Sequence, residues 1–215
     1  MPVWLALASI SNGIVDVGAN VGAYGLAACA VNTRCRVWAY EPVPELAAFV
    51  RESAVDNGWS DRVTVREVAL CDQTGELTFN STGALGSMSS LDTSGFRGKV
   101  GKTITVAAAL LDDELGEDEH VDLVKIDVEG FEDQVLRGMP GVLGRDRPTL
   151  MVECLPDGPY REVQEVLEAG GYEFFHLTAR GPRRTAAITP DVGEQERNFL
   201  ACARDDVRRV IDALG

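Results

Sequence analysis

The sequence predicts a doubly wound α/β fold: a mostly parallel, seven-stranded sheet with helices on both faces and an antiparallel hairpin at its C-terminal end. Strand-like and helix-like segments alternate over most of the chain, and a glycine-containing turn joins the first strand to the first helix. The chain has 215 residues, of which 45% are hydrophobic and 25% charged. This length and composition suit one buried core, so we expect a single domain over residues 1–215.

The first half of the chain predicts three strands and two helices. A short apolar run closed by glycine indicates the first strand, and an Ala-rich stretch indicates the helix after it. The second helix has a proline near its start, apolar residues at helical spacing and a glycine after its end. The expected strands cover residues 13–18, 36–41 and 63–68, and the expected helices cover residues 22–31 and 44–57.

The second half predicts four more strands. The strands cover residues 121–127, 149–154, 172–177 and 198–203, with helices over 131–137 and 160–169. Helices between strands imply parallel pairing through right-handed crossovers. The last two strands have a Pro/Gly/Arg-rich connection and no clear helix between them, which indicates an antiparallel hairpin at a sheet edge.

The net charge of the chain limits the classes of partner that it is expected to bind. A formal net charge of −14 repels phosphate backbones and anionic lipids, so we expect neither nucleic acid nor a membrane as partner. The five cysteines include no CxxC pair, and buried free thiols in the reducing cytoplasm are the expected use. The apolar stretch 1–10 is too short to span a membrane and lacks the basic start of a signal peptide.

Residues 80–101 form the one compositional anomaly, because Gly, Ser and Thr make up 12 of these 22 residues. A surface loop and an active-site lid are the two interpretations, and long loops in compact domains are often functional. Both interpretations stay open.

The turn after the first strand is a candidate ligand site. Residues 14–22 read IVDVGANVG, and glycines at such a turn let a ligand approach the backbone. Dinucleotide-binding turns carry G-x-G-x-x-G, whereas Gly18, Gly22 and Gly25 are spaced G-x-x-x-G-x-x-G. A carboxylate of Asp16 pointing into the pocket would repel a pyrophosphate and attract an ammonium group.

A second acid supports a nucleoside-containing ligand. Glu41 ends the second strand, 19 residues after Gly22, and is followed by Pro42. A carboxylate at this position can accept hydrogen bonds from both ribose hydroxyls. A solvated surface glutamate is the alternative.

With VDVGANVG and YEPVP before it, the fourth-strand sequence LVKIDVEGFE at residues 123–132 resembles the FkbM family of S-adenosylmethionine-dependent methyltransferases. The resemblance covers about residues 14–155 and includes the Ser-rich stretch 87–91 and Leu110-Leu111-Asp112-Asp113. It implies a Rossmann-like class I methyltransferase fold and O-methylation of a small biosynthetic substrate, such as a sugar or secondary metabolite. The implied cofactor residues are Asp16, Gly18, Ala19, Asn20, Gly22, Glu41, Pro42, Ala69, Leu70 and Asp127.

The family usually has a sizeable segment ahead of the first strand, which here starts near Gly13. We therefore expect a shortened N-terminal segment, with the pocket covered by the loop 80–101 or by a second copy in a homo-oligomer. No Asn/Asp-Pro-Pro-aromatic motif follows the fourth strand, which disfavours methylation of nucleic-acid nitrogen.

The candidate catalytic residues are Asp127, Glu129 and His176, each a group that could take the acceptor's proton. Lys125 and Asp127 alternate onto one strand face, and Glu153 ends the neighbouring strand. A Lys–Glu ion pair, a packing role for His176 and helix capping by Asp127 are the structural alternatives, and a divalent cation shared by two acids is a catalytic one. The candidate substrate-binding residues are Ser89, Ser90, Glu129 and Glu153. Two other functions stay open: a protein that binds the cofactor without catalysis, and a nicotinamide-dependent oxidoreductase.

Overall fold

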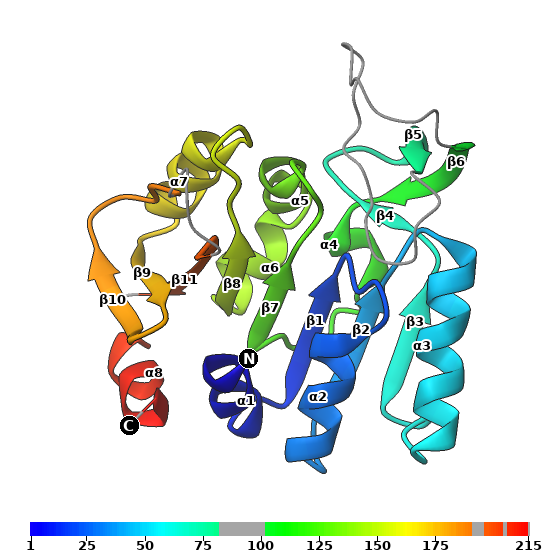
Figure 1. Ribbon diagram of the computed structural model, residues 1–215, viewed down its shortest axis with the longest axis horizontal. Helices are drawn as coiled ribbons and strands as arrows, with labels where there is room; N and C mark the ends of the chain where they lie inside the picture. Colours follow the sequence, from blue (N-terminus) through cyan, green and yellow to red (C-terminus); the bar gives the residue numbers. More distant parts are fainter. Residues whose placement is uncertain (82–101, 191–195, 204–205, 215) are drawn as a thin grey trace.

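An eight-stranded sheet forms the centre of the computed structural model, which describes residues 1–81, 102–190, 196–203 and 206–214 (Figure 1). The strand order is β10-β9-β11-β8-β7-β1-β2-β3. The bounds are β1 Gly13–Val17, β2 Arg36–Tyr40, β3 Val63–Arg66, β7 Leu123–Ile126, β8 Thr149–Glu153, β9 Tyr172–Thr178, β10 Gly181–Thr185 and β11 Asn198–Ala203. Strands β3, β2, β1, β7 and β8 pair in parallel, and β11 is antiparallel to both β8 and β9. The predicted doubly wound sheet with a C-terminal antiparallel pair is confirmed.

The sheet has one strand more than the predicted seven. The connection between the last two predicted strands forms β10, which pairs antiparallel with β9 at the sheet edge. Its sequence, GPRRT, has no apolar alternation and contains a proline, which is tolerated at an edge where no ladder partner is needed. These features hide the strand from a prediction based on hydrophobic periodicity.

A second, three-stranded sheet was not predicted. It contains β4 (Ala69–Leu70), β5 (Gly75–Ser81) and β6 (Lys102–Ala109), in the order β4-β6-β5. Strands β5 and β6 pair antiparallel on either side of the anomalous segment. Residues 80 and 81 of that segment end β5, and the rest of it lies outside the described residues.

Helices cover both faces of the large sheet (Figure 1). On one face lie α1 Pro2–Ser9, α2 Ala23–Val31, α3 Pro44–Asp56 and α8 Val207–Leu214, and on the other lie α4 Leu111–Glu114, α5 Glu132–Arg137, α6 Pro140–Arg145 and α7 Tyr160–Ala169. In the first layer, Trp4 and Leu7 of α1 pack in one buried cluster with Ile14 and Leu123 of the sheet. In the second layer, Leu167 packs in the other main cluster. In the described part of the chain, no helix has the length and apolar character to cross a membrane.

The order of the strands in the large sheet determines where a ligand site is expected. From β1 the chain runs outward to β2 and β3, and it returns to the other side of β1 with β7 and then β8. The switch point therefore lies between β1 and β7, and ligands of open parallel sheets bind beyond the carboxyl ends of the strands at this point. Those ends face upward in Figure 1.

Candidate active site

The turn after β1 depends on unusual backbone conformations. Gly18 and Gly22 have φ of 74° and 77°, and Asn20, with φ 52°, is also in the left-handed region that favours glycine. A side chain on Gly18 would begin 2.0 Å from the backbone carbonyl oxygen of Asp127. The glycine therefore lets the turn lie directly against the end of β7.

The turn's own N–H groups are bonded within the protein. The N–H groups of Gly18 and Ala19 both donate to the carbonyl oxygen of Tyr40, at 3.0 and 3.1 Å. The N–H of Asn20 donates to Oε2 of Glu41 at 2.7 Å. A pyrophosphate needs such donors free, so this bonding argues against a dinucleotide ligand, as the glycine spacing does.

Asp16 lies beneath the turn. Its side chain is buried, and Oδ2 accepts a hydrogen bond of 2.8 Å from the N–H of Gly25 in the first turn of α2. Burial is the main cause that raises the pKa of Asp16, to about 6. The prediction that the Asp16 carboxylate points into the pocket is therefore wrong. All five residues of β1 are buried because helices cover both faces of the sheet, and Asp16 stabilises the turn from within the protein.

Glu41 follows β2 beside the turn. It is buried, and its two oxygens accept hydrogen bonds from the N–H groups of Asn20 and Val43, at 2.7 and 2.9 Å. Burial raises its pKa. A carboxylate oxygen can accept a second hydrogen bond, so Glu41 keeps acceptor capacity for a ligand hydroxyl. The solvated alternative is excluded by the burial.

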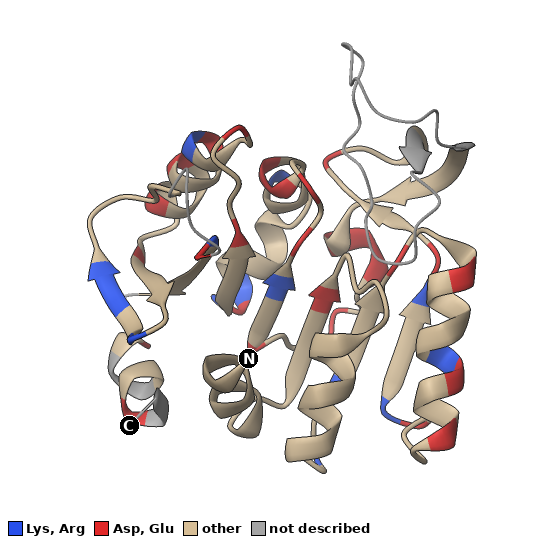
Figure 2. Cartoon of the chain, viewed as in Figure 1, with Lys and Arg blue, Asp and Glu red and all other residues tan. Residues whose placement is uncertain are grey.

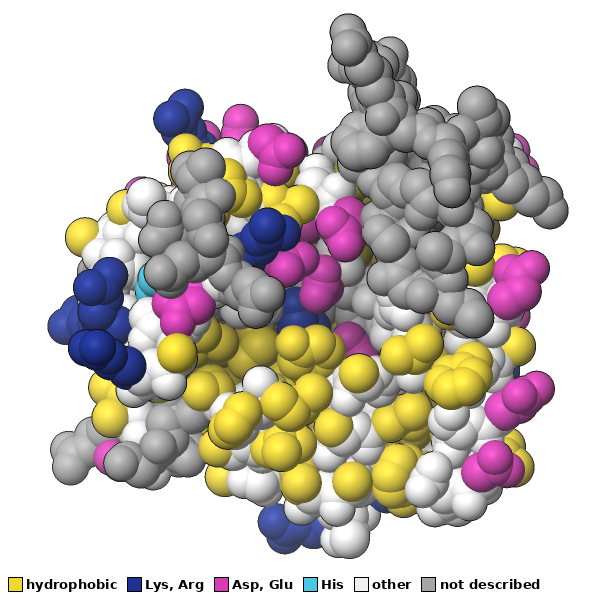
Figure 3. Space-filling view, in the orientation of Figure 1, with side chains coloured by type: hydrophobic (Ala, Val, Ile, Leu, Met, Phe, Trp, Pro, Cys, Tyr) yellow, Lys and Arg dark blue, Asp and Glu magenta, His cyan; other side chains and the backbone are white. Residues whose placement is uncertain are grey.

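Three carboxylates meet at the ends of β7 and β8. Oxygen atoms of Asp127, Glu129 and Glu153 all lie within 4.8 Å of one another, and each residue is partly exposed. Acidic residues occur at the upper ends of the central strands in Figure 2, and acidic side chains gather beside a hollow in Figure 3. The sequence prediction that Asp127 and Glu153 share one edge with Glu129 close by agrees with this geometry. Of the described residues, these three could also hold a divalent cation.

Lys125 supplies a buried positive charge to this cluster. Its Nζ lies 3.0 Å from Oδ2 of Asp127, and its side chain is 0% exposed. The prediction of a Lys–Glu ion pair is therefore wrong. In the described part of the chain, Lys125 forms its ion pair with Asp127.

The other two acids differ from ordinary surface carboxylates. Burial and the negative charge of Asp127 raise the pKa of Glu153. Burial also raises the pKa of Glu129, whose φ of 54° lies in the left-handed region. Such a backbone conformation costs energy in a residue other than glycine and occurs preferentially at functional sites.

The capping alternative for Asp127 is wrong. The helix after β7 begins at Glu132, and no described side chain caps it. The local backbone is instead bonded by Glu132, whose Oε1 accepts from the N–H groups of Gly130 and Val128, at 3.0 and 3.4 Å. The Asp127 side chain is 31% exposed, so part of its carboxylate remains accessible to a ligand beside the ion pair with Lys125.

His176 does not join the acids. Its Nε2 lies 2.8 Å from the carbonyl oxygen of Glu196, and its ring stacks on Phe199 with centroids 4.6 Å apart. The β-sheet register aligns His176 with Phe199 and Val152, so its side chain lies on the face opposite that of Glu153. This environment supports the packing role.

The remaining predicted residues lie around the turn or beyond the described chain. Pro42 is buried after Glu41, and Ala69 and Leu70 form β4 of the small sheet. Ser89 and Ser90 lie outside the described residues.

Two residues of the site were missed by sequence reasoning. Tyr24 of α2 places its ring 5.1 Å from Nζ of Lys125. Asn198 pairs in register with Glu153, and its Oδ1 is buried without a hydrogen-bond partner in the described chain. Tyr24 stands two residues after Gly22, so its place in the sequence already indicated that it lies near the turn. The pairing of Asn198 with Glu153 could not be predicted in this way, because it depends on β11 running antiparallel to β8.

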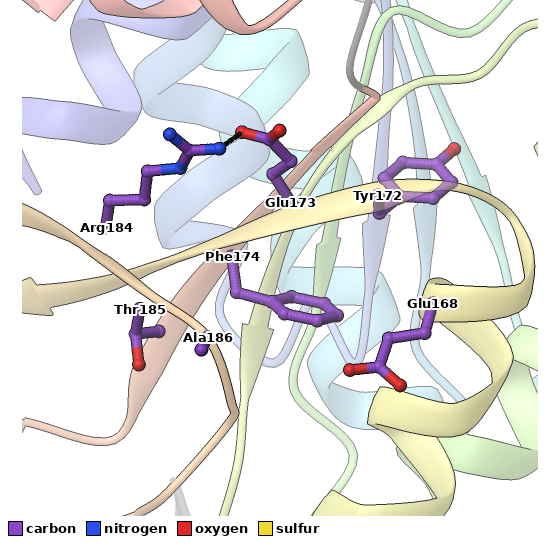
Figure 4. A pocket seen from close by; sticks show the side chains of 7 residues that line it. All are labelled: Glu168, Tyr172, Glu173, Phe174, Arg184, Thr185 and Ala186. Carbon is purple, nitrogen blue, oxygen red and sulfur yellow. Dashed lines mark ion pairs between the residues drawn. The ribbon is translucent and has the colours of Figure 1, made fainter.

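A separate cavity of about 640 Å³ lies elsewhere (Figure 4). It is lined by Glu168, Tyr172, Glu173, Phe174, Arg184, Thr185 and Ala186, and Arg184 forms an ion pair with Glu173 at 2.7 Å. These residues lie around the beginning of β9 at the sheet edge. The acids lie at the carboxyl ends of the central strands, so this cavity is distinct from the candidate active site.

Comparison with known proteins identifies a family and one relative. The methyltransferase FkbM domain matches residues 16–176. The 2-O-methyltransferase NoeI of Sinorhizobium fredii (strain NBRC 101917 / NGR234) is 29% identical over 193 residues, which cover 79% of this chain and 74% of that protein.

Solved structures share the fold at low sequence identity. The methyltransferase FkbM of Methylobacillus flagellatus KT has a TM-score of 0.57 at 16% identity, over 89% of this chain and 43% of that one. This chain thus spans less than half of that relative. The O-methyltransferase of Bacillus cereus in complex with SAH has a TM-score of 0.51 at 12% identity, over 94% and 78%. The domain match over most of the chain shows that this chain belongs to the FkbM family of S-adenosylmethionine-dependent methyltransferases.

Proposed function

We propose that the protein methylates a hydroxyl group of a small biosynthetic acceptor, of the sugar or secondary-metabolite type, with S-adenosylmethionine as methyl donor. One observation carries the proposal: Gly18 brings the turn after β1 into contact with the backbone of Asp127. A ligand on that turn therefore has the three carboxylates beside it.

The cofactor would lie along the turn. Glu41 would accept hydrogen bonds from the ribose hydroxyls, and Asp16 would support the turn through Gly25. The bonded N–H groups and the acidic surroundings suit a ligand that carries positive charge and no phosphate. When bound, S-adenosylmethionine supplies a methyl group activated by a positive sulfur.

Asp127 is the proposed base. The acceptor oxygen forms a bond to the methyl carbon, the carbon–sulfur bond breaks with its electron pair going to sulfur, and the hydroxyl proton passes to the Asp127 carboxylate. The products are a methyl ether and S-adenosylhomocysteine. Alignment of the acceptor oxygen with the methyl group supplies much of the rate enhancement in such displacements.

The surrounding groups suit a hydroxyl-bearing acceptor. Glu129 and Glu153, both partly exposed, offer hydrogen-bond acceptors, which pair with the O–H donors of a polyol. The name of the relative NoeI, a 2-O-methyltransferase, supports oxygen as the methylated atom. A divalent cation shared by the three acids is the alternative way to activate the hydroxyl.

The test is methyl transfer from labelled S-adenosylmethionine to a panel of methyl glycosides and aliphatic alcohols, with amines of matched size as the comparison. We expect label in a methyl ether and an equal amount of S-adenosylhomocysteine. Binding of S-adenosylhomocysteine without transfer to any acceptor would favour a cofactor-binding protein that does not catalyse. Transfer to amines alone would contradict the O-methyltransferase assignment.

We also propose that the protein works in the cytoplasm. Its cysteines, Cys29, Cys35, Cys71, Cys154 and Cys202, are all free and buried, as expected in a reducing compartment. The single-domain organisation, the lid function of residues 80–101 and a homo-oligomer stay predictions.

A further inference from the structure

Lys125 is a cation that the fold removes entirely from water. Its side chain is 0% exposed within β7, whose four residues are all buried. A buried charge carries a large desolvation cost, which an apolar residue of similar volume would avoid. Stability alone therefore gives no reason for a lysine at this position.

Three contacts fix the Lys125 ammonium group. Nζ lies 3.0 Å from Oδ2 of Asp127 and 3.2 Å from the carbonyl oxygen of Ile126. It also lies 5.1 Å from the centroid of the Tyr24 ring, within the range of a cation–π interaction. Tyr24 is itself held, because the indole N–H of Trp4 donates to its carbonyl oxygen at 2.9 Å and the two rings meet edge to face.

Asp127 has the opposite exposure. Its side chain is 31% exposed, so the ion pair joins a buried cation to an anion at the candidate active site. Glu129 and Glu153 bring oxygen atoms within 4.8 Å of this carboxylate. The side chain of Glu153 is hydrogen-bonded to Asp127, whereas the charge of Glu129 repels it, and Lys125 provides the attraction from the buried side.

We propose that Lys125 is a positioning residue: it holds the carboxylate of Asp127 toward the acceptor site, and the Tyr24 ring holds Lys125 in place. Lys125 does not reach the acceptor itself, because none of its side chain is exposed. The inference rests on the proposed function, since the positioned group is the proposed base.

A double-mutant cycle tests the inference. The proteins are wild type, Lys125→Met, Asp127→Asn and the double variant, assayed with the best acceptor of the methyl glycoside panel. We expect Lys125→Met to lower kcat about 10- to 100-fold, while the Kd for S-adenosylhomocysteine and the KM for the acceptor change by less than about 3-fold. In the Asp127→Asn background, Lys125→Met should cause no further loss, because the group that it positions is already gone. Additive losses, or an unchanged kcat in Lys125→Met, would overturn the inference.

Tyr24 gives a second test should Lys125→Met fail to fold. Tyr24→Phe keeps an aromatic face under the ammonium group, whereas Tyr24→Leu removes it. We expect kcat to fall several-fold in the leucine variant and to stay near wild type in the phenylalanine variant. Equal kcat values in the two variants would contradict the role of the ring.

Two further measurements separate positioning from general damage. Leu167→Ala removes a fully buried side chain on α7, so it should lower the melting temperature and leave kcat unchanged. Crystal structures of wild type and Lys125→Met with S-adenosylhomocysteine should show the Asp127 carboxylate rotated in the variant. An unrotated carboxylate would overturn the inference even if no acceptor is found, whereas failure of wild type to bind S-adenosylhomocysteine would count against the proposed function instead.

Discussion

The carbonyl oxygen of Asp127 occupies the space that a side chain on Gly18 would need, since the first side-chain atom would lie 2.0 Å from it. This contact joins the turn after β1 to the end of β7. It places the candidate cofactor site and the acidic cluster next to each other.

We therefore expect Gly18→Ala to be severe. Gly58 provides a matched control, because its φ of 71° is close to the 74° of Gly18 and, apart from its chain neighbours, no described residue has an atom within 4 Å of the position that its side chain would occupy. Gly58→Ala should lower the free energy of unfolding by about 1 kcal/mol from backbone strain, and Gly18→Ala by about 1–3 kcal/mol more from the clash. Urea denaturation measures both free energies of unfolding. Equal losses in the two variants would show that the contact between Gly18 and Asp127 does not contribute to stability.

Ligand selectivity gives a second prediction. S-adenosylhomocysteine should raise the melting temperature, because a ligand that binds the native state stabilises it by mass action. NAD should not, because the N–H groups of Gly18, Ala19 and Asn20 are already bonded within the protein. Differential scanning fluorimetry at matched ligand concentrations measures both shifts, and a shift with NAD alone would overturn the family's expected cofactor for this chain.

Glu41→Ala should weaken cofactor binding by about 1–3 kcal/mol, since the ribose hydroxyls lose a charged acceptor. The same change removes the bonds to the N–H groups of Asn20 and Val43, so some stability should be lost as well. Glu45→Ala, an exposed acid in the first turn of α3, serves as the control and should alter neither quantity much. Calorimetry on a folded Glu41→Ala protein with unchanged affinity would remove Glu41 from the cofactor site.

The buried Asp16 predicts a dependence of stability on pH. Its pKa rises from 3.8 to about 6 on folding, so the folded protein keeps a proton that the unfolded chain releases. Stability contributed by this group is therefore complete below pH 3.8 and is lost as the pH rises to about 6, by an amount on the order of 2–3 kcal/mol. Asp16→Asn should lose less stability than wild type between pH 4 and pH 7, as measured by urea denaturation. Parallel losses in the two proteins would contradict a raised pKa.

The sequence predicted the parts of this site that topology alone determines. Asp127 follows the strand next to β1, and the order of alternating strands and helices was enough to place it beside Gly18. Hydrophobic periodicity does not tell which helix residue meets which strand residue, so the contact of Tyr24 with Lys125 was missed. The burial of Asp16 was missed for a related reason. In the sequence, an aspartate in a strand covered on both faces cannot be told from an aspartate that faces a pocket.

The small sheet was missed for a different reason. In the sequence, β5 and β6 stand before and after most of the Gly/Ser/Thr-rich segment, and a connection of this length lacks the short turn motif that identifies a hairpin.

A comparison of Asp127 and Glu153 distinguishes a general base from a cation site. Burial and the charge of Asp127 raise the pKa of Glu153, so glutamine is a close mimic of the protonated side chain. If Asp127 is the base, Asp127→Asn should lower kcat about 100-fold or more, and Glu153→Gln should lower it only a few-fold. The exposed Asp113→Asn on α4 is the matched control and should remain fully active.

A cation held by both acids predicts a different pattern. Both variants would then lose activity to a similar extent, because each removes a charged ligand. Wild type would also lose activity in a chelator and regain it with magnesium. If wild type stays active in chelator, and Asp127→Asn loses far more activity than Glu153→Gln, Asp127 is the base. A neutral glutamine can replace a protonated glutamate, whereas an asparagine cannot accept the proton of the acceptor hydroxyl.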